Sequence, residues 1–263
     1  MESSDVFRES MLACADALRP YCDWELMPAL RGEVADTVDV VQPTLFAVLV
    51  SLARLWRSYG VEPGAVVGHS QGEIAAAHVA GVLSLADAAK VVALRSRALR
   101  TVAGTGGMVS VPLPLARTRF VLDTLGGRVS VAAVNGPSIT VVAGESTALE
   151  ELLAACARED VEARRVEVDY ASHTGDMDVL RERLAVDLAD VTAQPGTVPM
   201  YSTLTGGIAD TTTMGGSYWF ENLRNTVRFD PAVREVVRDR GRVFLEISPH
   251  PVLTFGVQQI LDD

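Results

Sequence analysis

Five residues, Gly68-His69-Ser70-Gln71-Gly72, join a short apolar stretch at 65–67 to a run of small residues at 73–80. This pattern predicts a strand, a sharp turn and a helix, which is the setting of a nucleophile elbow. The glycines permit close packing of the helix on the strand, and the Ser70 hydroxyl then stands at the helix N-terminus, with the Gln71 N–H as a donor for an oxyanion. With a long helix predicted from Pro43, this part of the chain forms a βα unit of a parallel sheet.

The order of the predicted elements changes at Gly107. Residues 107–168 alternate as strand, helix, strand, strand, helix and strand, which builds a small antiparallel sheet with two helices on one face. The α/β alternation then resumes, with a helix at 178–189, a strand at 198–202, a helix at 231–238, a strand at 242–247 and a last helix from Val252. We therefore expect an α/β fold with a discontinuous large subdomain, 1–106 and 169–263, and an inserted small subdomain at 107–168.

Composition excludes several classes of protein. The net charge is -11 and the basic residues are scattered, which argues against nucleic acid as a partner. The three cysteines, Cys14, Cys22 and Cys156, show neither a disulfide framework nor zinc-site spacing, so we expect reduced thiols, a cytoplasmic protein and no metal. The N-terminus lacks a signal-peptide pattern, and the apolar stretch at 45–55 is broken by Ser51 and Arg54, so we expect no membrane segment.

A serine nucleophile needs a base, and four histidines are available by type. His69 adjoins Ser70 but points along the turn, and His78 lies in the middle of a predicted helix. His250, after the last predicted strand, occupies the place of the base in an α/β-hydrolase, whereas His173 follows the strand that closes the small subdomain. The residues by themselves leave these last two alternatives open.

Ser84, with Asp87 three residues later, predicts the start of a helix. Arg95 stands out because it lies on the apolar stripe of this helix. The stripe comprises Leu85, Ala88, Val91, Val92 and Leu99. A buried guanidinium needs a carboxylate, which belongs either to the protein or to a substrate. Periodicity alone favours an internal salt bridge.

Several motifs resemble the acyltransferase domain of a modular type I polyketide synthase, a family related to malonyl-CoA acyl carrier protein transacylases. They are VDVVQP at 38–43, GHSQGE at 68–73, LRSRAL at 94–99, GGMVSV at 106–111, VNGPSITVVAG at 134–144, YASH at 170–173, NLRNTVRF at 222–229 and SPHPVL at 248–253. The resemblance implies an α/β-hydrolase-like large subdomain with a ferredoxin-like insertion. It also implies Ser70 as nucleophile, His173 as base, Arg95 as ligand of a malonyl-type carboxylate, and a main-chain carbonyl near Arg228 that orients the histidine. The resemblance further implies that SPHP at 248–251 is a structural turn, which makes His250 the less favoured candidate for the base.

The same resemblance implies a substrate. Val38 to Gln42, Gln71 and Tyr170 to His173 agree with relatives that select methylmalonyl units, whereas malonyl-selective relatives tend towards HAFH at the last site. Ser172 is smaller than phenylalanine and leaves room for an α-methyl group, although one methyl group is worth only about 1–3 kcal/mol of discrimination. The implied partners are methylmalonyl-CoA, an acyl carrier protein with its phosphopantetheine thiol, and the neighbouring domains of a multienzyme synthase. No cofactor is implied.

One departure from the family concerns the N-terminus. Relatives begin with a strand and a Gly-Gln-Gly segment whose glutamine supplies a second oxyanion donor, and the sequence starts downstream of both, so we expect the isolated chain to be impaired. Two alternatives to the transferase follow: a serine thioesterase or other hydrolase that uses Ser70 with His250, and a truncated, non-catalytic docking module.

Overall fold

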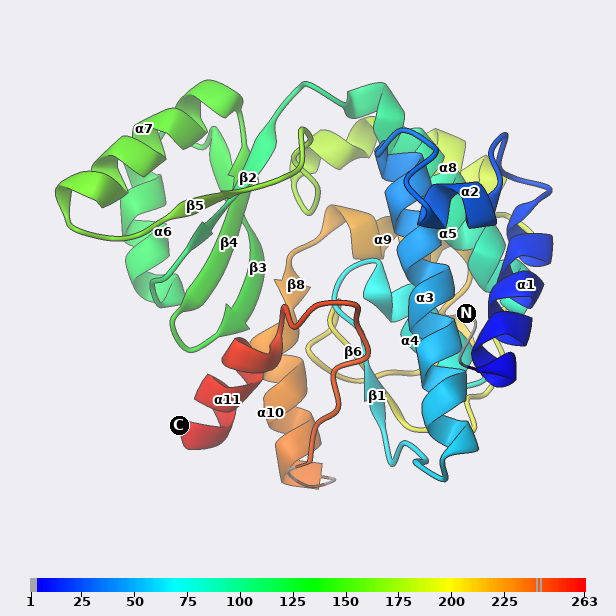
Figure 1. Cartoon of the computed structure of the whole chain (residues 1–263). Helices are drawn as coiled ribbons and strands as arrows, with labels where there is room; N and C mark the ends of the chain where they lie inside the picture. Colours follow the sequence, from blue (N-terminus) through cyan, green and yellow to red (C-terminus); the bar gives the residue numbers. More distant parts are fainter. Residues whose placement is uncertain (1–3, 240, 242) are drawn as a thin grey trace.

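Two separate sheets organise the computed structural model in Figure 1, which describes residues 4–239, 241 and 243–263. The sheet beside the elbow has the order β1-β6-β7, with β1 (Val66–Val67) parallel to β6 (Met200–Ser202) and β7 (Gly207–Ile208) antiparallel to β6. Its strands are short, and most of the surrounding core comes from helices. The mixed α/β class expected from the sequence is confirmed.

Helices from the first part of the chain pack on one another beside this sheet, with α4 in contact with β1 and β6, as the right half of Figure 1 shows. They are α1 (Asp5–Leu18), α2 (Leu26–Leu30), α3 (Val38–Ser58), α4 (Gly72–Val79), α5 (Leu85–Leu99) and the 3-10 turn η1 (Arg100–Val102). Helix α3 starts at Val38 rather than at Pro43 as predicted, so the proline lies inside the helix. Among the described helices, only α3 is long and apolar enough to cross a membrane, by length and composition alone. Its most apolar stretch has a mean hydropathy of 1.6. Here it packs against α1 and α5.

The inserted segment forms the second sheet, at the left of Figure 1. Its elements are β2 (Gly107–Val111), α6 (Leu115–Asp123), β3 (Val129–Gly136), β4 (Ile139–Gly144), α7 (Ser146–Arg158) and β5 (Arg164–Val166), in the predicted order. The sheet has the order β5-β2-β4-β3-β8, and its pairs are antiparallel except for the last. Strand β8 (Val227–Arg228) belongs to the later segment and pairs in parallel with β3. The small sheet is therefore completed by a strand from outside 107–168.

Both faces of the small sheet are covered, by helices of different origin. Val109 and Val142 pack with residues of α6 and α7 in one apolar cluster. Their strand neighbours Met108 and Val141 belong to a second cluster, with residues of α10 (Phe229–Asp239) and α11 (Thr254–Asp262). This alternation is the period of two that a strand requires. The second face joins the insertion to the rest of the chain.

The later segment departs from the prediction in several places. The helix expected at 178–189 is divided into a 3-10 turn, η2 (Gly175–Leu180), and α8 (Arg181–Asp187). The strand expected at 242–247 does not form: Arg242 lies outside the described residues, and 243–247 have no regular secondary structure. A strand needs a partner for its backbone groups, and no described strand pairs with this segment. The turn η3 (Thr211–Thr213) and the helix α9 (Gly216–Arg224) form where no element was predicted, as do β7 and β8.

Candidate active site

Ser70 occupies a strained turn between β1 and α4. Its φ is +52°, in the left-handed region that few non-glycine residues adopt, as a nucleophile elbow requires. Gly68 makes the turn possible, because a Cβ there would lie 2.4 Å from the Cα of Glu73 and 2.5 Å from the carbonyl oxygen of Gly72. Gly72 has open space around the same position. Only the first glycine of the motif is therefore sterically required.

The fold places His173 against the serine, although 103 residues separate them. The Ser70 Oγ and the His173 Nε2 are 2.7 Å apart. His173 also has a positive φ, +63°, and its backbone N–H donates to the carbonyl of Leu223 at 2.9 Å. The histidine that the family resemblance implied is thus the one in contact with Ser70.

The carbonyl that orients His173 is that of Asn225, 2.9 Å from Nδ1, and not one at Arg228. The predicted position was wrong because Arg228 lies in β8, where it pairs with Val134 and its N–H donates to the carbonyl of Thr203. Asn225 is the C-cap of α9, and the last carbonyls of a helix have no partner within it. Accepting from Nδ1–H leaves Nε2 unprotonated and able to accept the Ser70 proton.

The electrostatics of the site keep His173 neutral. It is 5% exposed, and burial together with the positive Arg95 and with His69 lowers its pKa to about 3. The two carbonyl groups that face its ring oppose this shift. A neutral imidazole is the form that can act as a general base.

The other histidines have different surroundings. His69 Nε2 is 2.8 Å from Asn135 Oδ1 in β3, and its ring packs edge-on against Phe229. The His78 Nδ1 is 3.1 Å from the carbonyl of Leu83. His250 is exposed on the loop before α11. The arrangement in which His250 would serve Ser70 is not the one that the structure forms.

Arg95 is 1% exposed, as its place on the apolar stripe predicted. Its Nη1 donates to the Oδ1 of Asn222 at 2.5 Å, and its Nε is buried without a partner. No ion pair of the described residues includes Arg95, so the internal salt bridge that periodicity favoured is absent there. Burial lowers its pKa to about 10, although Tyr170 and Glu73 oppose this. A cation with free donors is therefore left to meet an anion.

Of the residues expected to choose the substrate, Tyr170 and Ser172 are buried, whereas Gln42 and Gln71 are half-buried. Gln42 Nε2 donates to the hydroxyl of Tyr170 at 3.3 Å, which joins two of the three specificity segments. The side-chain oxygens of Gln42 and Gln71 are buried without partners. The Ser172 hydroxyl is directed at the Sδ of Met108 in β2, 3.6 Å away. The Gln71 N–H, at the start of α4, donates to no acceptor among the described residues.

Sequence reasoning missed three polar residues of the site. Glu73 is fully buried one turn after the nucleophile, and Asn222 connects it to Arg95. Asn225 supplies the carbonyl for His173. All three lie in motifs quoted above, GHSQGE and NLRNTVRF. A polar residue inside such a motif was therefore the signal in the sequence that could have identified them.

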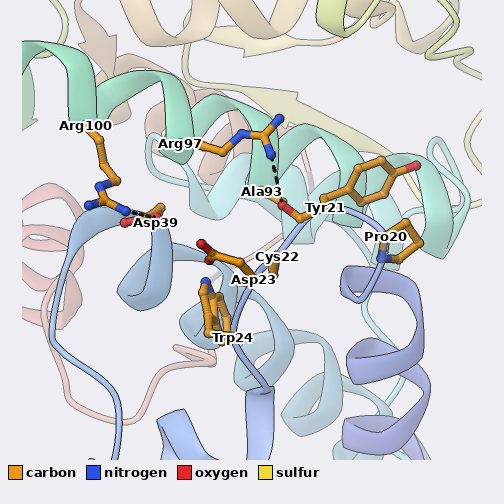
Figure 2. Close-up of a pocket in the computed structure, with 9 residues that line it drawn as sticks. All are labelled: Pro20, Tyr21, Cys22, Asp23, Trp24, Asp39, Ala93, Arg97 and Arg100. Carbon is orange, nitrogen blue, oxygen red and sulfur yellow. Dashed lines mark hydrogen bonds and ion pairs between the residues drawn. The ribbon is translucent and has the colours of Figure 1, made fainter.

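Two cavities accompany these groups. One, of about 370 Å³, is lined by Leu204, Thr205, Asn225, Thr226 and Arg228. The other, of about 240 Å³, is lined by Asp39, Trp24 and the outward-facing Arg97 of α5 and Arg100 of η1 (Figure 2). Neither Ser70 nor His173 lines either cavity, and the second also shares no residue with the surroundings of His173 described above. The described residues contain no group of three or more side chains suited to a metal ion.

Comparison with known proteins places the chain in a family. The family described as the acyl transferase domain matches residues 1–263. The chain is 55% identical over 267 residues to the spectinabilin polyketide synthase system protein NorA of Streptomyces orinoci, and 51% identical over 263 residues to erythronolide synthase EryA2 of Saccharopolyspora erythraea. These matches cover 100% and 98% of the chain but only 14% and 7% of those proteins.

Solved structures agree with the sequence relatives. The acyltransferase domain from module 8 of the salinomycin polyketide synthase superposes with a TM-score of 0.94 at 51% identity, covering 98% of this chain and 62% of that one. A loading acyltransferase from the avermectin modular polyketide synthase gives a TM-score of 0.96 at 47% identity, over 99% of this chain and 85% of that one. Because the family matches from end to end and these structures share the fold, the chain belongs to the acyl transferase domain family, as its motifs predicted.

Proposed function

We propose that this chain is the acyltransferase of a modular polyketide synthase and loads a methylmalonyl unit from coenzyme A onto an acyl carrier protein through an ester on Ser70. The observation that carries the proposal is the 2.7 Å contact between Ser70 Oγ and a neutral, carbonyl-oriented His173, close to a buried arginine whose donors are not used up. A nucleophile, its base and a cation for a carboxylate are the groups that this transfer requires.

In the first half-reaction, His173 accepts the proton of the Ser70 hydroxyl while Oγ attacks the thioester carbonyl carbon. The Gln71 N–H, at the N-terminus of α4, donates to the oxyanion. The C–S bond then breaks, His173 gives its proton to the sulfur, and coenzyme A leaves as a thiol. Arg95 holds the distal carboxylate of the acyl group throughout.

In the second half-reaction, the thiol of the carrier protein's phosphopantetheine gives its proton to His173 and attacks the Ser70 ester. The C–O bond breaks, and the proton returns from His173 to Oγ. The carrier then holds the acyl group as a thioester, and the enzyme is regenerated in a ping-pong cycle. No metal or redox cofactor enters the cycle.

The choice of methylmalonyl rests on residues near the base. Gln42 and Tyr170 are in contact, and the small Ser172 directly precedes His173. The partnerless oxygens of Gln42 and Gln71 mark buried polar atoms that a bound substrate could satisfy. A carrier protein and neighbouring synthase domains as partners, in the cytoplasm, complete the proposal.

Intact-mass measurement after mixing the chain with methylmalonyl-CoA tests this function. A stable increase equal to one methylmalonyl group, lost in Ser70→Ala, is the expected result. Release of free methylmalonic acid without an adduct would instead identify a hydrolase, and no change in protein or thioester would identify a non-catalytic module. Addition of a phosphopantetheinylated carrier protein should then discharge the adduct onto the carrier.

A further inference from the structure

Glu73 is a buried acid that the proposed reaction does not use. It lies on α4 three residues after Ser70, with 0% exposure. Its Oε2 accepts hydrogen bonds from the backbone N–H of Thr203 at 3.2 Å, the Thr203 hydroxyl at 2.7 Å and the Nδ2 of Asn222 at 3.1 Å. Its Oε1 accepts from the hydroxyl of Tyr218. Burial raises the pKa of Glu73, and the four donors around its carboxyl group oppose that rise and stabilise the charged form.

Asn222 lies between this acid and Arg95. Its Nδ2 donates to the Oε2 of Glu73, while its Oδ1 accepts from the Nη1 of Arg95 at 2.5 Å. The side chain is 3% exposed. An ionised carboxylate only accepts and a guanidinium only donates, so the amide has a single orientation that satisfies both neighbours. Asn222 therefore lies between the guanidinium and the carboxylate and is hydrogen-bonded to both.

The same helix end also holds the base. The main-chain carbonyls of Asn222 and Asn225 face the His173 ring, and the carbonyl of Leu223 accepts from the His173 backbone N–H. Helix α9, which carries these residues up to its C-cap, packs against α5, which carries Arg95. One short helix thus fixes both the proton acceptor and the arginine.

We infer that Asn222 is a positioning residue, which keeps the Arg95 guanidinium out of an ion pair with Glu73 and so leaves it directed to the substrate carboxylate. The long-range attraction of Glu73 stabilises the arginine as a cation without occupying the donors that the substrate needs. A carboxylate at position 222 would bind Arg95 itself and would face Glu73 as a like charge. This inference rests on the proposed function, because it assigns Arg95 a substrate carboxylate.

The test is the Asn222→Asp variant, measured in competition between methylmalonyl-CoA and the uncarboxylated propionyl-CoA. The readout is the ratio of the two kcat/KM values for acylation of Ser70, which does not depend on how much of the protein is folded. We expect this ratio to fall by about 10- to 100-fold, the value of a lost hydrogen bond to a charged group. Asn222→Ser, which keeps a hydroxyl donor and acceptor but is shorter, should give a smaller fall.

Two controls separate positioning from structure. Thr140→Val removes a buried hydrogen bond to the carbonyl of Leu113 in the small sheet and should leave the ratio unchanged. Asn222→Asp added to Arg95→Ala should cause no further fall, because the arginine through which it acts is gone. An unchanged ratio in Asn222→Asp, or an additive effect in the double variant, overturns the inference. A wild-type chain that is acylated by neither thioester overturns the proposed function instead.

Discussion

The sheet that carries Ser70 and the sheet of the inserted segment are built in opposite ways. Strands β1, β6 and β7 have two or three residues each, and helices supply most of the core around them. Strands β2, β3 and β4 have five to eight residues and pair along their lengths. Yet the short sheet holds the nucleophile, and all four histidines of the chain lie outside 107–168.

This difference shows that one region provides regular strand pairing and the other provides the catalytic side chains. The long sheet satisfies its backbone groups by regular pairing, whereas Ser70 and His173 both have left-handed φ values that regular strands do not accept. The two regions meet at β8, which pairs with β3. Strand β8 begins two residues after Asn225, whose carbonyl orients His173. The regular sheet therefore fixes one end of an irregular site.

The largest expected effect comes from removing the Ser70 hydroxyl or the His173 imidazole, which lie in the region of the short sheet. Ser70→Ala should abolish acyl labelling, because no other described hydroxyl contacts His173 Nε2. His173→Ala should slow acylation by about 10²- to 10⁴-fold, the usual contribution of a general base. His250→Ala is the matched control and should retain normal rates in the same intact-mass time course. A larger loss from His250→Ala would reinstate the hydrolase arrangement.

The strain at the elbow gives the next effect. Gly68→Ala should lower the free energy of unfolding by about 1–3 kcal/mol or more, because its Cβ would overlap the backbone of α4. Gly72→Ala should be neutral or stabilising, since the position is open and helical. Urea unfolding of the two variants compares them directly. No loss in Gly68→Ala would mean that the turn relaxes around the added Cβ, and equal loss in both variants would contradict the assignment of Gly68 as the sterically required glycine.

A smaller effect concerns the contact between the two regions. Tyr170→His together with Ser172→Phe removes the bond from Gln42 and puts a ring where a hydroxyl now faces Met108. The preference for methylmalonyl-CoA over malonyl-CoA should fall, by at most about 10- to 200-fold, without complete inversion, because Gln71 and the upstream segment remain. Competition kinetics give the ratio. A wild-type preference for malonyl-CoA would show that the specificity assignment is wrong.

The smallest expected effect is that of pH on the rate of acylation, which should hardly change. Because the pKa of His173 is lowered to about 3, acylation should vary by less than about twofold between pH 8 and pH 5, whereas an ordinary imidazole would lose about 30-fold. Between pH 6.5 and about 3 the unfolded chain binds a proton at this residue and the folded chain does not, so stability contributed by His173 falls as the pH falls. A rate profile with a midpoint near pH 6.5 would contradict the burial of the base.

Several features of the site could be predicted from the sequence because they depend on residues that are close together in the chain. Ser84 accepts from the N–H of Asp87 as its capping pattern predicted, and Arg95 lies on the buried face of the same helix. The turn around Ser70 follows from adjacent glycines and an apolar strand. Short-range sterics and side-chain periodicity fix these features, and neighbouring residues suffice to specify them. The strand expected at 242–247 fails for the opposite reason, since a strand depends on a partner elsewhere.

The sequence by itself determined the elbow, the buried arginine, the order of the inserted elements and, through its motifs, the family. Only the tertiary structure decided that His173 contacts Ser70, that Asn225 rather than Arg228 orients it, and that Asn222 joins Arg95 to Glu73. The contacts of Asn222 with Arg95 and Glu73 connect residues 127 and 149 positions apart. Such contacts depend on how helices and sheets pack, and the packing is a property of the whole chain, because each buried polar group must find its partner among all the surfaces that come together.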